Sequence, residues 1–100
     1  HIPHLIAYNM VNLIAGKSNR DTLLEFAASG FKDFSRIAGS SPEVWKDISL
    51  ANKTAILNDL DLFIKEINKT ASLIKNEDYI ALEKYFEVAS KIRKNWSEKN

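Results

Sequence analysis

The stretch SPEVWKDISLANKTAILNDLDLFIKEINKTASLIK, residues 41–75, decides the fold of this chain. Its only proline comes second and it contains no glycine, so no strong helix breaker lies inside it. Ser41 is a good N-cap, Pro42 suits the first helical position and Glu43 favours the positive end of the helix dipole. We therefore predict one continuous helix from Pro42 to about Lys75, roughly 50 Å long.

Apolar residues along this stretch recur at the spacing of a helix face. One row is Ile56, Leu60, Phe63, Ile67, Ala71 and Ile74, and a second is Leu50, Leu57 and Ile64. Two such rows on so long a helix exceed what short neighbouring helices of one chain cover. A second chain is the simplest cover, so we expect a homodimer that forms through its helices.

The rest of the chain is also predicted to be helical, in a single domain over residues 1–100. The expected helices span residues 3–15, 21–28, 31–38 and 78–96, with a break at Ser29-Gly30 and a turn at residues 76–78. We expect the last helix to fold back antiparallel on the long one. The predicted fold class is all-α, a long central helix packed against shorter helices.

Composition excludes several kinds of function. The chain has no cysteine, so disulfides, thiolate metal sites and cysteine nucleophiles are ruled out. A formal net charge of +1 argues against nucleic acid as the main partner. No apolar run approaches the roughly 20 residues of a membrane span. We expect a reduced, cytoplasmic setting, and the start at His1 inside an apolar helical pattern suggests a piece of a longer protein.

His1 and His4 are three residues apart, so both lie on one face of a helix N-terminus. Such a pair could ligate a metal, but no third ligand is near and no His-Glu-x-x-His motif is present, so we expect no metal. A histidine at this end of a helix can also donate a hydrogen bond or a proton to an anion. The alternative is that the pair only caps the helix, with His1 left from an expression tag.

Arg36 lies in an otherwise apolar turn. Its guanidinium could hold a carboxylate through two parallel hydrogen bonds. The alternative is an ion pair within the chain, with Asp33 or Asp47.

Trp45 and the pair Ser29-Gly30 could likewise each belong to a binding site or have only a structural role. The indole could form the wall of a pocket, or it could simply pack in the core beside Ile48. Gly30 could let a ligand approach the backbone, or the pair could only break a helix. No nucleophile elbow and no phosphate loop is present, so no catalytic residue is predicted.

Four segments together resemble the C-terminal helical domain of the prephenate dehydrogenase family. They are His-Ile-Pro-His at residues 1–4, Gly-Phe-Lys-Asp-Phe-Ser-Arg-Ile-Ala at 30–38, Ser-Pro-Glu-Val-Trp-Lys-Asp-Ile at 41–48, and Asn52. The resemblance covers essentially the whole chain. It implies a dimerising fold like the C-terminal domain of 6-phosphogluconate dehydrogenase. One departure is Ala28-Ser29-Gly30, where many members have two or three consecutive glycines.

The resemblance also implies an activity, the oxidative decarboxylation of prephenate to 4-hydroxyphenylpyruvate in tyrosine biosynthesis, with NAD or NADP. The cofactor and the catalytic histidine would belong to the family's N-terminal Rossmann domain, so this chain alone is expected to be inactive. The implied substrate-binding residues are His1, His4, Ser29, Gly30, Lys32, Arg36 and Trp45. Implied partners are prephenate, a second copy and that Rossmann domain, with no nucleic acid and no membrane. The alternatives are an arogenate dehydrogenase domain and a stand-alone helical module for dimerisation or ligand sensing.

Overall fold

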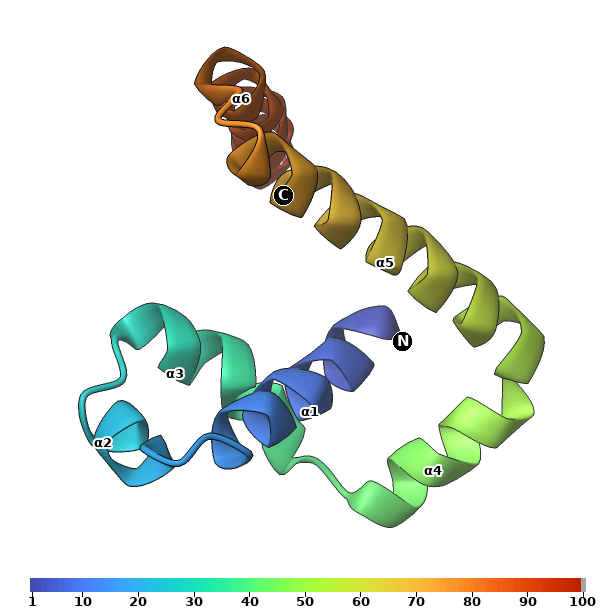
Figure 1. Ribbon diagram of the computed structural model, residues 1–100. Coiled ribbons are helices and arrows are strands. Elements are labelled where there is room, and N and C mark those ends of the chain that lie inside the picture. The colour runs from blue at the N-terminus through green and yellow to red at the C-terminus, as the bar shows by residue number, and fades with distance from the viewer. Residues whose placement is uncertain (100) are drawn as a thin grey trace. The chain divides into compact units, whose positions relative to one another are not determined.

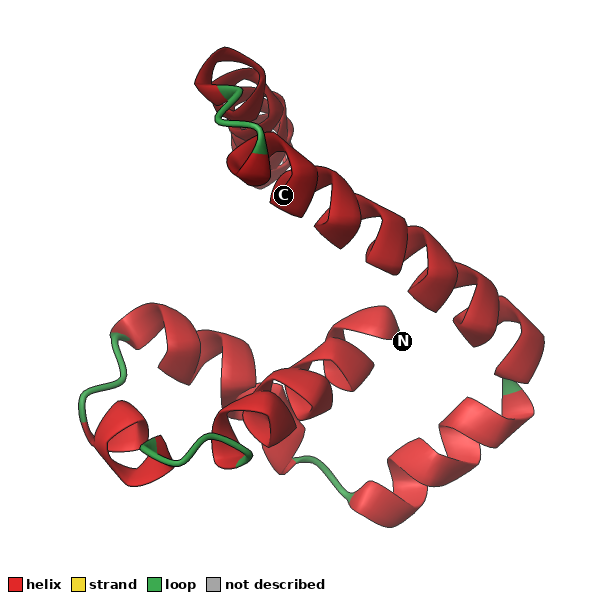
Figure 2. Ribbon diagram, in the orientation of Figure 1, coloured by secondary structure: helices red, strands yellow, loops and turns green. Residues whose placement is uncertain are grey.

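The computed structural model describes residues 1–99, with side chains through residue 98, and every ordered element in this range is a helix (Figure 2). The elements are α1 (Ile2–Ala15), α2 (Arg20–Glu25), α3 (Ser29–Ser35), the 3-10 helix η1 (Arg36–Gly39), α4 (Pro42–Ala51), α5 (Lys53–Lys75) and α6 (Tyr79–Lys99). The predicted all-α fold class is confirmed. Among the described residues, no helix has both the length and the apolar character that a membrane crossing requires.

The predicted helix from residue 42 to residue 75 is interrupted at Asn52, so that prediction is wrong in one respect. Its start is as expected, because the Ser41 hydroxyl accepts a hydrogen bond from the Val44 backbone N–H at 3.3 Å. At Asn52 the backbone leaves the helical region, with φ −119° and ψ 29°. The Asn52 side-chain amide donates to the Ile48 carbonyl at 2.8 Å, and such side-chain bonds compete with helix continuation. The chain changes direction there (Figure 1).

The chain divides into two compact units, unit 1 (His1–Leu60) and unit 2 (Asp61–Asn100). In unit 1, α1 is the central element and packs against α2, α3 and η1 (Figure 1). The small core of this unit contains Ala7, which is fully buried, and Ile56, which is 5% exposed. The Tyr8 hydroxyl donates a hydrogen bond of 2.8 Å to the Ser40 carbonyl, which ties the end of η1 to α1.

The predicted break at Ser29-Gly30 is wrong by about two residues. Both residues lie in the first turn of α3, and the residue before them, Ala28, is its N-cap. The Ala28 carbonyl accepts hydrogen bonds from the Phe31 and Lys32 backbone N–H groups at 3.1 and 3.2 Å. The helix therefore starts before Gly30, because a glycine in the first turn does not prevent these bonds from forming.

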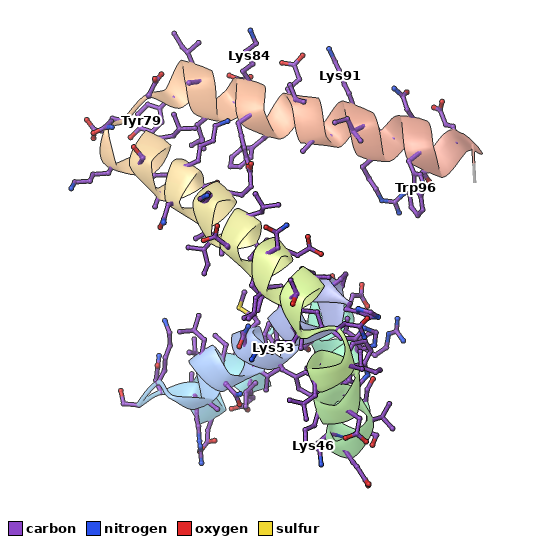
Figure 3. The ribbon with its side chains drawn as sticks, turned by 90° about the vertical axis from the view of Figure 1, so that its right-hand side faces the viewer. Lys46, Lys53, Tyr79, Lys84, Lys91 and Trp96 are labelled. Carbon is purple, nitrogen blue, oxygen red and sulfur yellow. The ribbon has the colours of Figure 1, made fainter. Side chains whose placement is uncertain are left out.

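Unit 2 contains the greater part of α5, the turn at residues 76–78 and α6. The predicted turn is confirmed, because Glu77 has a left-handed φ of 54° and Asp78 caps α6 by accepting a hydrogen bond from the Ala81 backbone N–H at 3.2 Å. Beyond the turn the two helices diverge (Figure 3). The expected antiparallel packing along their length is therefore wrong for the single chain. Polar side chains, Glu66 and Tyr85, meet where the helices come near each other.

Candidate functional site

Three aromatic rings from two helices gather at the N-terminus of α1. The imidazole of His4 stacks on the indole of Trp45, with ring centroids 3.9 Å apart and planes 14° from parallel. His1 meets the same indole edge-on, at 6.1 Å and 75°. His4 and Trp45 are half-buried and His1 is exposed. The N-cap at Ser41 starts α4 one turn before Trp45, which sets the position of the indole.

A groove of about 270 Å³ lies beside this ring cluster. Its lining comes from α1 and α4: Leu5, Tyr8, Asn12, Pro42, Trp45, Lys46 and Ser49. Trp45 therefore both lines the groove and contacts the rings of His1 and His4. An apolar wall with a few polar groups around it is typical of small-molecule sites.

Arg36 opens η1, and its side chain is exposed. Among the side chains that the structure describes, it has no ion pair, so neither Asp33 nor Asp47 neutralises it. Asp47 lies 3.8 Å from Lys46 instead. The guanidinium of Arg36 thus has its donors available for an anion from outside the chain.

The other predicted residues of this segment are Ser29, Gly30 and Lys32, all on α3 and all exposed. A Cβ built on Gly30 would meet no heavy atom within 4 Å, and its φ is not left-handed. Neither packing nor backbone conformation therefore requires a glycine here, and the space beside its backbone is open. A ligand can approach this first turn of α3 closely.

The predicted residues on α3 and η1 do not contact the ring cluster of His1, His4 and Trp45, but helix α1 connects the two groups. In the described part of the chain, no hydrogen bond, ion pair or ring contact joins Arg36 to the ring cluster. However, α3 and η1 both pack against α1, which carries His1 and His4. Tyr8, one turn after His4, fastens the end of η1 through its bond to Ser40. The sequence signal for Tyr8 is its place one helical turn after His4, on the same face of α1.

Comparison with known proteins decides the family. A family profile described as "Prephenate dehydrogenase, dimerization domain" matches residues 1–88 of this chain. This chain belongs to that family. The resemblance seen in the sequence is therefore confirmed, and all seven predicted substrate-binding residues lie within the matched range.

Relatives of this dimerization domain are found in whole enzymes of known name. The chain is 42% identical over 94 residues to prephenate dehydrogenase of Bacillus subtilis, covering 93% of this chain and 25% of that protein. It is 36% identical over 95 residues to cyclohexadienyl dehydrogenase of Zymomonas mobilis, covering 93% of this chain and 32% of that protein. A prephenate dehydrogenase of Lactococcus lactis is 32% identical over 94 residues. The chain spans about a third or less of the length of these curated relatives.

The residues of this prephenate dehydrogenase dimerization domain do not fit a dinucleotide cofactor. Such a site needs a strand, a glycine-rich turn and a helix in succession. The three glycines of the chain, Gly16, Gly30 and Gly39, are far apart, and residues 1–99 contain no strand. We therefore assign no step through the nicotinamide to this chain. No three of its described histidine and carboxylate side chains are grouped so that they could hold a metal ion.

Proposed function

We propose that this chain is the dimerisation and substrate-binding part of an NAD- or NADP-dependent prephenate dehydrogenase. The enzyme converts prephenate to 4-hydroxyphenylpyruvate in tyrosine biosynthesis, in the cytoplasm. Membership of the family supports the proposal. The observation that carries it is the exposed, unpaired guanidinium of Arg36 on an element that packs against the helix of His1 and His4.

The substrate's chemistry matches the side chains that this proposal assigns to it. Prephenate carries two carboxylates, which call for cations and strong hydrogen-bond donors. Arg36 would hold one carboxylate through two parallel hydrogen bonds, and Lys32, on the preceding helix α3, adds positive charge. His1 and His4 would donate to the substrate at the N-terminus of α1, where the helix dipole also favours an anion. The indole of Trp45 forms an apolar wall for the ring.

The backbone at Ser29 and Gly30 completes the proposed site. Backbone N–H groups in the first turn of a helix have no partner within it and can donate to a carboxylate. In many family members this segment contains consecutive glycines, and the serine hydroxyl here offers one further donor. Both residues are exposed, and the space beside Gly30 is open.

The residues that this chain contains indicate which parts of the reaction it would support and which belong to the cofactor domain. The reaction removes a hydride and CO2 from the ring, which becomes aromatic and so supplies the driving force. The cofactor domain, which we propose precedes this chain as an N-terminal Rossmann domain, supplies the hydride acceptor and the catalytic histidine. The residues described here orient the substrate and neutralise its charge, a contribution that depends on positioning. The homodimer, formed through the helices, holds two such sites.

Arogenate is the second candidate substrate. One relative is named for the cyclohexadienyl ring rather than for a single substrate, and both prephenate and arogenate contain such a ring. Arogenate carries an amino acid group where prephenate has a keto acid. The carboxylate that Arg36 would hold is common to both.

Rates of NADH and NADPH formation by the full-length protein test this proposal directly. We expect turnover with prephenate and a lower kcat/KM with arogenate. The reverse order would make the protein an arogenate dehydrogenase. No turnover with either substrate would favour a helical dimerisation or ligand-sensing module. The 100-residue chain alone is expected to give no turnover, since its described residues do not form the strand, glycine-rich turn and helix of a dinucleotide site.

A further inference from the structure

The 3-10 helix η1 carries Arg36 but is too short to keep its place by itself. It begins at Arg36, directly after α3 ends at Ser35, and it ends at Gly39. Four residues of 3-10 helix make few hydrogen bonds, of poorer geometry than those of an α-helix, so such a segment has little stability of its own. Where η1 lies in unit 1 therefore depends on its contacts with α1 and α3.

The Tyr8 hydroxyl fixes the far end of η1. Ser40, the C-cap residue, has an extended backbone, and its N–H donates to the Ile37 carbonyl at 3.2 Å. The Ser40 carbonyl accepts the hydrogen bond of 2.8 Å from Tyr8 on α1. Because Tyr8 and Ser40 are both half-buried, water replaces this bond less readily than it would at an exposed site. The bond thus determines where η1 ends on α1.

The backbone of η1 alone sets the position of the Arg36 side chain. Among the described residues, no hydrogen bond, ion pair or ring contact holds this guanidinium, and the side chain is exposed. Arg36 precedes Ser40 by four residues, which is roughly 8 Å along a 3-10 helix. A shift of the Ser40 end of so short a helix therefore moves the arginine as well.

Tyr8 also sets the spacing between Arg36 and His4. His4 and Tyr8 are four residues apart on α1, so they lie one turn apart on one face of the helix. The bond from Tyr8 to the end of η1 consequently places Arg36 in a defined position relative to His4. Prephenate carries two carboxylates on one rigid ring, so its binding groups must stand at matching distances.

We propose that Tyr8 is a positioning residue of the substrate site, because its hydrogen bond to the Ser40 carbonyl holds η1, and so Arg36, at the distance from His4 that the substrate requires. This role rests on the proposed function, which assigns a carboxylate of prephenate to Arg36, and it needs no contact between Tyr8 and the substrate. A misplacement of about 1 Å can cost a hundredfold in rate. The loss should be smaller here, since the other contacts of η1 with α1 and α3 remain.

Steady-state kinetics of the full-length enzyme with Tyr8→Phe test this role. The substitution removes the hydroxyl and keeps the ring. Tyr85→Phe is the matched control, because it makes the same chemical change and also removes a hydrogen bond between two helices, from Tyr85 to Glu66. Those helices, α5 and α6, carry none of the proposed substrate residues. Tyr8→Met, with flexible apolar bulk and no hydroxyl, is a second variant in case Tyr8→Phe folds poorly.

We expect Tyr8→Phe to raise KM for prephenate roughly threefold to tenfold, with kcat and KM for the cofactor unchanged. A loss of stability alone would give a different result. It would reduce the amount of active enzyme, and so lower the apparent kcat, while the KM of the remaining enzyme stayed the same. Tyr85→Phe should show at most that effect.

A double-mutant cycle with Arg36→Ala shows whether Tyr8 acts through that arginine. In the Arg36→Ala enzyme, adding Tyr8→Phe should raise KM by less than about twofold, because no guanidinium is left to position. A larger rise in that background would overturn the role of Tyr8. An unchanged KM in Tyr8→Phe and Tyr8→Met alone would overturn it too.

The Arg36→Ala enzyme by itself separates this role from the proposed function. If its KM for prephenate is raised, the proposed function stands whatever the Tyr8 variants show. If its KM is unchanged, the proposed substrate site is wrong, and the role of Tyr8 falls with it.

Discussion

The imidazole of His4 lies flat on the indole of Trp45, with 3.9 Å between ring centroids and 14° between ring planes. The two residues come from different helices, so this stack positions the start of α1 against the start of α4. It also limits how the imidazole can turn, since a tilt would lose contact with the indole. A histidine held in this way presents its ring nitrogens in a defined direction.

Replacing Trp45 with alanine should therefore weaken substrate binding. A stacked aromatic pair is worth about 0.5–1.5 kcal/mol beyond its buried area, so we expect KM for prephenate to rise roughly twofold to tenfold in the full-length enzyme. Trp45→Phe keeps a ring under His4 and should restore part of the loss. Steady-state kinetics of both variants check this. Equal KM values for Trp45→Ala and the unsubstituted enzyme would show that the stack has no role in binding.

The hydrogen bond from Tyr8 to the Ser40 carbonyl should contribute measurably to the stability of unit 1. It is partly buried and links residues 32 positions apart. Tyr8→Phe should lower the free energy of unfolding by about 0.5–1.5 kcal/mol. Tyr79→Phe is the matched control, because the Tyr79 side chain is 63% exposed. Chemical denaturation measures both, and an equal loss in the two variants would contradict a specific role for Tyr8.

How far the sequence predicts this structure depends on how local each feature is. Helix type and the cap at Ser41 follow from nearby residues and were predicted. The break at Asn52 was missed because it depends on a side-chain amide that competes for the Ile48 carbonyl, although asparagine favours such positions. The divergence of α6 was missed because it depends on which apolar surfaces meet in three dimensions, which the spacing of residues along the sequence does not specify.

In the candidate site, too, local features could be predicted from the sequence and contacts between distant segments could not. Spacing placed His1 and His4 on one helix face, but nothing in the spacing brings Trp45 to them from a later helix. Only the family resemblance grouped these residues, and the structure then brought the three rings together. The position of Arg36 relative to the rings depends on the packing of η1 on α1, which the sequence pattern does not specify.

The hydrogen bond between Tyr85 and Glu66 should appear in the alkaline titration of the protein. That bond, with lesser effects of burial and of the Glu66 charge, raises the pKa of Tyr85 above its ordinary value of 10.0. Since the protonated phenol is the form that donates, its stabilising effect is present below pH 10.0 and is lost as the pH rises through the raised pKa. Stability should therefore fall with rising pH in that range.

Phenolate absorbance measures this titration. Tyr85→Phe should remove the tyrosine that ionises at the higher pH, and Glu66→Gln should bring the pKa of Tyr85 back toward its ordinary value. A titration curve that keeps its most alkaline step in Tyr85→Phe would assign that step to another tyrosine and contradict the prediction.

The most direct test of the proposed substrate site is the KM for prephenate after Arg36→Ala in the full-length enzyme. Loss of a charged hydrogen-bonded contact costs about 1.5–3 kcal/mol, so we expect KM to rise roughly tenfold to hundredfold while KM for the cofactor stays the same. Arg20→Ala is the matched control, because Arg20 contacts the Ala15 carbonyl and Asp21 and lies outside the site. If Arg36→Ala and Arg20→Ala both leave the KM for prephenate unchanged, Arg36 does not bind the substrate and the proposed site is wrong.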